Sequence, residues 1–95
     1  MYKHAKSCAD KNFVLLYCES KSKQTKVGFS ISKKFGKAVQ RNRIRRQLKA
    51  AVSTVIEQVK EGYNVIFIPR QREAYLYEDV NQSVRALFKK AGLLQ

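Results

Sequence analysis

The sequence predicts one α+β domain, residues 1–95, built as a two-layer sandwich of a four-stranded mixed sheet and two helices. Three observations lead to this fold class. Patterns typical of strands occupy the first third and the middle of the chain. The chain also contains two amphipathic helical patterns. One lies between two of the strands, and the other lies near the C-terminal end. The 95 residues, 44% of them hydrophobic, suffice for one small core.

The first two strands differ in pattern. Residues 1–8 are short and polar, so we expect a brief edge strand there. Residues 12–19 carry apolar side chains on both faces, which indicates a strand that is central or covered on both sides. The polar residues 20–25 predict the loop of a hairpin that leads into the next strand.

Residues 26–33 predict the second main strand, because their side chains alternate cleanly in type. Val27, Phe29 and Ile31 form its expected core face. The opposite face is small and polar and consists of Gly28, Ser30 and Ser32. Such a face leaves room for a ligand chain close to the backbone. The solvent-facing side of an antiparallel sheet is the alternative interpretation.

The long helix is predicted over residues 37–60, with Gly62 as its stop. Its apolar residues follow the i, i+3, i+4, i+7 rule: Leu48, Ala51, Val52, Val55, Ile56 and Val59. Residues 63–68 are an almost continuously apolar strand that Pro69 ends. Because a helix joins this strand to residues 26–33, we expect the two strands to be parallel.

The last predicted element is a helix over residues 77–91, which Gly92 ends. Its apolar stripe consists of Val80, Val84, Leu87, Phe88 and Ala91.

Positive charge is concentrated at the start of the long helix. The chain carries 20 Lys+Arg against 7 Asp+Glu, a formal net charge of +13, and residues 33–49 contain no acid. Cations at a helix N-terminus oppose the helix dipole, whereas a phosphate there suits both the dipole and the free N–H groups. The pattern therefore favours nucleic acid as the partner, and a solvated basic face is the simpler alternative.

Other classes of site find little support in the sequence. Cys8 and Cys18 lack the spacing of a metal site and are expected to be free thiols in a reducing compartment. His4 is expected at the surface. The seven acids form no metal motif, and we find no phosphate-binding Gly-rich loop or catalytic triad pattern. No apolar run reaches the length of a membrane span, and no signal peptide is visible. We therefore expect a cytoplasmic binding module without a membrane partner.

The run KVGFSISKKFGKAVQRNRIRR, residues 26–46, resembles the bacterial ribonuclease P protein family. The family's mark is a hydrophobic-Gly-hydrophobic-Ser strand followed by Lys-Lys, Gly, Ala-Val and Arg-Asn-Arg, and weaker similarity covers nearly the whole chain. The resemblance implies a left-handed β-α-β crossover, against the usual right-handed rule. The family usually has a further N-terminal helix beside the sheet, most of which this sequence lacks, with Tyr2 matching an aromatic position at its end. We therefore expect a cleft with one wall missing.

The resemblance also implies a function. The protein would be the non-catalytic subunit of a ribonucleoprotein endoribonuclease, a hydrolase that removes the 5′ leader of precursor tRNA. The RNA subunit would carry the active site and its Mg²⁺ ions. The expected partners are this catalytic RNA and precursor tRNA, with no obligate protein partner and no activity of the protein alone.

Most site residues follow from the matched positions, and Ser32 follows from the strand pattern of residues 26–33. The residues expected to bind the RNA subunit are Lys33, Lys34, Lys37, Arg41, Asn42, Arg43, Arg45, Arg46 and Lys49. Those expected to bind the leader are Val14, Leu16, Ser30, Ser32 and Lys33. Asn42 could instead tie the helix start, and at Leu16 the family often has an aromatic residue.

Two other functions remain open from the sequence. One is a ribosome-type structural RNA-binding protein without a role in cleavage. The other is a nuclease with an active site of its own.

Overall fold

The computed structural model describes residues 6–21, 23–70 and 75–94. Its elements, in order, are β1 Lys6–Ala9, β2 Phe13–Glu19, β3 Lys26–Phe29, the 3-10 turn η1 Lys33–Phe35, α1 Ala38–Ser53, the 3-10 turn η2 Ile56–Gln58, β4 Tyr63–Pro69 and α2 Tyr77–Lys90. The predicted class is confirmed, since four strands form one mixed sheet with two helices. The expectations for Tyr2 and His4 lie outside the described residues.

The strand order is β1-β2-β4-β3, so β4 lies between β2 and β3. β4 is parallel to β3, as predicted, and antiparallel to β2. The predicted hairpin between β2 and β3 is therefore wrong, because the almost continuously apolar β4 takes the central place between them. β2 forms its hairpin with β1 instead, where Asp10 Oδ1 accepts hydrogen bonds from Asn12 N and Phe13 N, both at 2.8 Å.

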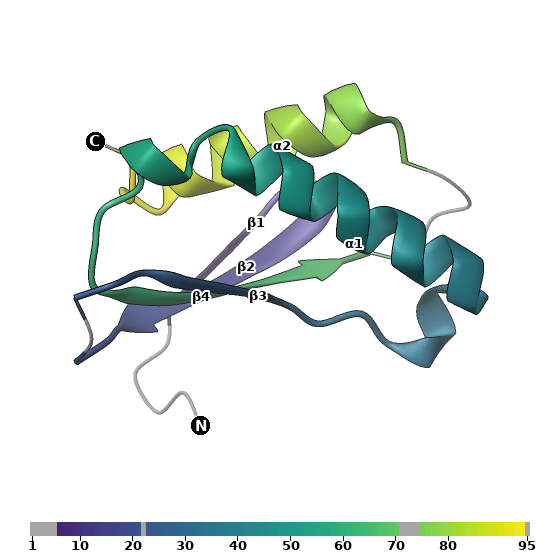
Figure 1. Ribbon diagram of the computed structural model, residues 1–95, viewed down its shortest axis with the longest axis horizontal. Coiled ribbons are helices and arrows are strands. Elements are labelled where there is room, and N and C mark those ends of the chain that lie inside the picture. Colours follow the sequence, from purple (N-terminus) through teal and green to yellow (C-terminus); the bar gives the residue numbers. More distant parts are fainter. Residues whose placement is uncertain (1–5, 22, 71–74, 95) are drawn as a thin grey trace.

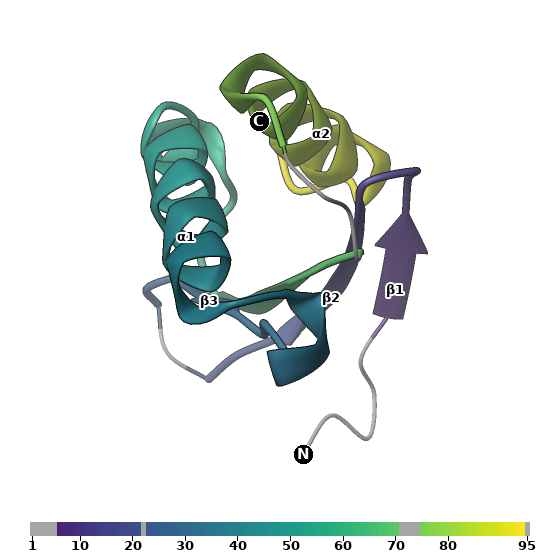
Figure 2. The ribbon, with the colours of Figure 1, turned by 90° about the vertical axis from the view of Figure 1, so that its right-hand side faces the viewer.

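Both helices cover the same face of the sheet (Figures 1 and 2). β3 runs toward the start of α1, which returns antiparallel above the sheet to β4. Followed through the two views, this connection is left-handed, as the family resemblance implies. Such crossovers are rare, because the twist of strands normally favours the right-handed form.

α1 is shorter than predicted, since it ends at Ser53 and not at residue 60. Ser53 Oγ donates to Ala50 O and Thr54 Oγ1 donates to Ala51 O, each at 2.7 Å, and such bonds compete with a regular helix. Val55 and Val59 stay buried all the same, held by η2 and by a single bridge to the C-terminal segment. Gly62, with φ 87°, therefore serves the turn into β4 and ends no helix.

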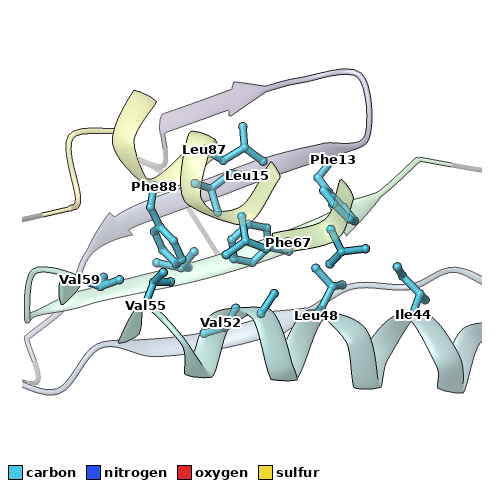
Figure 3. Close-up of a cluster of buried hydrophobic side chains, with 14 of the residues drawn as sticks. Phe13, Leu15, Ile44, Leu48, Val52, Val55, Val59, Phe67, Leu87 and Phe88 are labelled. Carbon is cyan, nitrogen blue, oxygen red and sulfur yellow. The ribbon is translucent and has the colours of Figure 1, made fainter. Parts of the chain in front are cut away.

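The core lies between the sheet and the helices. Figure 3 shows Phe13, Leu15 and Phe67 from the sheet facing Leu48 and Phe88 from the helices, and all five are fully buried. The Phe67 ring meets the Phe88 ring edge-on at 5.4 Å between centroids. Because the large apolar side chains of β2 and β4 point to this side, alternation sends their neighbours to the other face.

α2 agrees closely with the prediction. It buries Val80, Val84, Leu87 and Phe88. Gly92, with φ 76°, ends it: Leu93 N donates to Phe88 O at 2.9 Å and Gly92 N to Lys89 O at 3.0 Å.

The two cysteines are free, as expected. Cys8 lies in β1 and Cys18 in β2. Burial raises the pKa of the Cys8 thiol, which lies 3.7 Å from Leu87 O.

Candidate RNA interface

An aromatic anchor fixes the segment before α1. Phe35 in η1 is buried, and its ring stacks on Tyr75 at 6.0 Å between centroids. Tyr75 in turn stacks on Phe13 at 5.3 Å and accepts at its carbonyl a hydrogen bond from Gln47 Nε2 at 3.0 Å. The sequence interpretation missed η1, although a lone Phe between lysines was a signal for an anchor. Lys33 and Lys34 directly precede Phe35 in the same 3-10 turn, so the buried Phe35 ring holds both lysines at the surface.

A neutral cap begins α1. The side chain of Gln40 turns back, so that Oε1 accepts a hydrogen bond from the backbone N–H of Lys37 at 2.8 Å. Gly36 makes this possible, because a Cβ there would collide with Gln40 Oε1. The first turn of α1 contains no acid. The helix start is thus ordered without adding negative charge to it.

The residues predicted to bind the RNA subunit gather around this start, and we call them the basic head. Eight of its nine side chains are exposed, and Arg41 is half-buried. Lys33 and Lys34 come from η1, Lys37 caps α1, and the others lie on α1 itself. Within residues 6–21, 23–70 and 75–94, none of the eight cations pairs with a carboxylate. The head is therefore a surface whose charge the described protein leaves uncompensated.

Arg41 differs from the rest of the head. It lies close to the apolar line of α1, and its Nε is buried with no hydrogen-bond partner among the described residues. A buried polar nitrogen without a partner costs free energy. An anion that binds the outer nitrogens of this guanidinium would offset part of that cost.

The flanks of α1 face different neighbours. Gln47 points to Tyr75, on the α2 side. Lys49 lies over the β3 edge, where it lines a groove of about 270 Å³ together with Val27, Phe29 and Val52. The head thus reaches from the outer surface of α1 down to the edge of the sheet.

The sheet face that points away from the helices is the second candidate surface, and we call it the open face. No helix of the described chain covers it. Strand register and alternation assign its residues: Ser7, Ala9, Val14, Leu16, Cys18, Lys26, Gly28, Ser30, Asn64, Ile66 and Ile68. It contains four half-buried Val, Leu or Ile side chains and no acid.

The predicted leader residues are only partly together on this face. Val14 and Leu16 lie side by side on β2 as expected. Ser30 directly follows β3, so β4 separates it from Val14 and Leu16. Its N–H continues the β3–β4 ladder by donating to Phe67 O at 2.9 Å. Ser32 lies beyond β3, which ends at Phe29 and not at residue 33, and it precedes η1. The expectation that Ser32 shares a strand face with Ser30 is wrong for this reason.

Sequence interpretation missed the residues at the centre of the open face. Ile66 and Ile68 of β4 separate the two predicted groups, with Ile66 opposite Leu16 and Gly28. The signal was present, since a strand that is apolar on both sides belongs in the centre of a sheet.

The described residues do not fit a bound metal. They contain no group of three or more His, Cys, Asp or Glu side chains able to share an ion. Neither of the two helices is long and apolar enough, over its described residues, to cross a bilayer.

Comparisons with known proteins agree with this geometry. The family model described as ribonuclease P matches residues 1–92. A curated relative from Clostridioides difficile, named ribonuclease P protein component, is 40% identical over 98% of this chain and 83% of its own length. One of the same name from Clostridium kluyveri is 38% identical over 98% of this chain and 86% of its own length.

Solved structures extend the similarity. The RNase P protein of Staphylococcus aureus superposes with a TM-score of 0.88 at 28% identity, over 99% of this chain and 87% of that chain. The RNase P protein of Thermotoga maritima, at 24% identity, shares the fold with a TM-score of 0.85 over 94% and 86% of the two chains.

Proposed function

The chain belongs to the ribonuclease P protein family, and we propose from this premise that its two surfaces bind two different RNAs. Family membership makes it the protein component of a ribonucleoprotein endoribonuclease, a hydrolase of tRNA processing. In our proposal the basic head docks on the catalytic RNA subunit and the open face holds the 5′ leader of precursor tRNA. Lys49 lies beside Val27 and Phe29 of β3, and Ser30 directly follows this strand, so both proposed surfaces border β3.

The uncompensated charge of the basic head is the observation that carries the first assignment. Arginine and lysine bind phosphates by replacing condensed counterions, which makes such binding strong and dependent on salt. The exposed Arg43, Arg45 and Arg46 lie off the apolar stripe, so they are available to RNA without any change in the core. Their spread over α1 suits the broad surface of a folded RNA.

The open face suits a single strand of RNA. Its aliphatic centre offers packing to bases, and the small residues Gly28 and Ser30 allow close approach of a chain. Its described residues include no aromatic side chain for stacking, and Leu16 stands where the family often has one. We expect the leader to be held by packing and backbone contacts, with little dependence on most of its sequence.

Catalysis is assigned to the RNA subunit. Mg²⁺ supplies the activation of water and the stabilisation of the leaving oxygen in hydrolysis of a phosphodiester. Since the described residues do not fit such an ion, we propose that the RNA holds it. The protein then contributes binding and orientation of the leader. We also propose a cytoplasmic location, where precursor tRNA and the catalytic RNA are available.

The first test uses purified protein without RNA. We expect no Mg²⁺-dependent cleavage of precursor tRNA by the protein alone, and cleavage after addition of the catalytic RNA. Cleavage that persists in RNA-free protein, and is lost when its acids are replaced, would instead favour a nuclease with its own active site. Binding of RNA without any gain in cleavage would favour a ribosome-type protein.

The second test probes the open face with Ser30→Phe in the reconstituted holoenzyme. The bulky ring should fill the space beside Ile68 and reduce affinity for precursor tRNA by roughly tenfold, the loss of one or two packed bases. Affinity for mature tRNA and for the RNA subunit should not change. Ser30→Ala, which keeps the space open, is the matched control. Equal losses for precursor and mature tRNA would contradict the assignment of the leader to this face.

A further inference from the structure

We propose that a pocket on the helix side of the sheet, beside the end of α2, binds a guanine nucleotide. The rings of Tyr17 and Tyr63 hold the base, the Glu19 carboxylate accepts hydrogen bonds from its edge, and the Lys6 ammonium group binds the phosphate. These four side chains belong neither to the basic head nor to the open face. The inference therefore stands apart from the proposed function and can fail or hold without it.

The pocket, which we call the end pocket, lies between one end of the sheet and the segment that follows α2. Its volume is about 500 Å³, within the range of roughly 300–1,000 Å³ that is typical of small-molecule sites. The strands contribute Lys6, Tyr17, Glu19 and Tyr63 to its lining, and the segment after α2 contributes Ala91 and Leu93. Aromatic, apolar and charged groups thus converge on one concave site.

Strand pairing directs the side chains of the end pocket to one face. Lys6 of β1 lies opposite Tyr17 of β2, and Glu19 lies opposite Tyr63 of β4. Tyr17 follows the buried Leu15 by two residues, so alternation turns this set toward the helix side. Tyr17 and Tyr63 are diagonal neighbours on that face, about 7–8 Å apart, so one planar base can contact both rings.

The two tyrosine rings are available to a ligand. Both are half-buried at the border of the core. The ring contacts within the described chain join other aromatic residues, and none of them involves Tyr17 or Tyr63. Stacking on aromatic side chains is a common means of holding an unpaired base. The pair can therefore hold a base without giving up a contact between aromatic rings.

Two opposite charges make the end pocket selective. Lys6 and Glu19 are exposed, and neither forms a hydrogen bond or an ion pair with another described residue. A carboxylate can only accept hydrogen bonds, and its two oxygens suit two adjacent N–H donors. Guanine presents such a pair, N1–H and the N2 amino group, whereas the other three bases place an acceptor beside their donor. The Lys6 ammonium group supplies the charge that binds a phosphate.

The experiment titrates the full chain with guanosine 5′-monophosphate (GMP) and with inosine 5′-monophosphate (IMP), which lacks only the N2 amino group. Calorimetry should show that GMP binds about tenfold more tightly, because IMP loses one hydrogen bond to a charged group. Glu19→Ala should make the two affinities nearly equal. This variant changes an exposed side chain, so it should remain folded.

Two further variants test the base and the phosphate separately. Tyr63→Leu should weaken both nucleotides by about tenfold, while Tyr63→Phe, which keeps the ring, is its matched control. Lys6→Met should weaken GMP but leave the nucleoside guanosine unchanged. Its matched control is Lys11→Met, which removes an exposed lysine outside the pocket.

Binding of phosphate to the basic head is separated by one more variant. Arg43→Ala, Arg46→Ala removes charge from the head and should keep the preference for GMP over IMP. The inference is overturned by the absence of saturable GMP binding, by equal affinities for GMP and IMP, or by a preference that survives in Glu19→Ala.

Competition distinguishes a free nucleotide from an unpaired guanine of a bound RNA as the natural ligand. If the RNA subunit or precursor tRNA displaces GMP, and Tyr63→Leu weakens binding of that RNA, the end pocket takes a base of the RNA. If GMP still binds to the holoenzyme and remains sensitive to Glu19→Ala, the pocket takes a free nucleotide.

Discussion

The basic head and the open face differ in the physical means by which each could bind RNA. The head is exposed, strongly cationic and carried on one helix with its preceding turn, whereas the open face is half-buried, largely aliphatic and spread over four strands. Charge acts at long range and falls with salt, while packing acts only in contact and depends little on salt. If the two surfaces bind as proposed, the head should supply most of the affinity and the open face the discrimination between precursor and mature tRNA.

The two surfaces also differ in what holds them in place. The head depends on a few specific contacts, namely the buried Phe35 ring and the Gln40 cap. The open face is the reverse side of the core sheet, so every ladder hydrogen bond supports it. Substitutions should therefore disturb the geometry of the head more easily than that of the face.

The largest effect should come from removing charge from the head. The double variant Arg43→Ala, Arg46→Ala should weaken binding to the RNA subunit by at least roughly a hundredfold at low salt, because each charge-assisted contact contributes about 1.5–3 kcal/mol. The slope of log K against log salt should fall by about two. Binding at several salt concentrations measures both quantities.

The control for this variant is Arg85→Ala, which removes an exposed arginine of α2 outside both surfaces. It should leave the slope nearly unchanged. The thermal midpoint of the double variant should also stay the same, since both arginines lie away from the core. An unchanged salt slope would show that the head does not contact phosphates.

The sequence predicted much of the fold because the apolar periods are strong. It placed both helices, the parallel pairing of β3 with β4, and the position of the basic head on α1. Its errors have physical causes. The apolar period continues through Val55 and Val59 although the helix has ended, since a 3-10 turn keeps both residues on the core. Adjacent strands usually pair, so the sequence did not reveal that β4 inserts between β2 and β3.

The same insertion explains why the sequence predicted only part of the open face. Val14 and Leu16 were found from their strand, but their neighbours on the face come from β4, more than forty residues later in the chain. Alternation within one strand cannot identify such neighbours, because register between distant strands is a tertiary property.

A smaller effect should appear at the cap that orders the head. Gly36→Ala displaces the side chain of Gln40 and so breaks its hydrogen bond to Lys37 N. A double-mutant cycle with Gln40→Ala should give a coupling of about 1 kcal/mol in the free energy of unfolding. In the Gln40→Ala background, Gly36→Ala should no longer destabilise, because nothing remains for the new methyl group to displace. Chemical denaturation of the four proteins measures the cycle, and additive effects would mean that the cap contributes nothing.

The smallest effect, and the sharpest contrast between stability and binding, should come from Gly28→Ala. A Cβ at Gly28 would approach Ile66 Cγ1 at 3.9 Å, an ordinary contact, and the backbone there does not require glycine. Glycine inside a strand costs roughly 0.5–1 kcal/mol relative to alanine, so the variant should be more stable by about 0.5 kcal/mol. The new methyl group, however, projects into the open face where the leader should lie close to the backbone. Affinity for precursor tRNA should therefore fall by a few-fold while RNA-subunit binding is unchanged. If the variant is more stable and binds precursor tRNA equally well, the leader does not pass over Gly28. The leader would then lie over β1 and β2 instead.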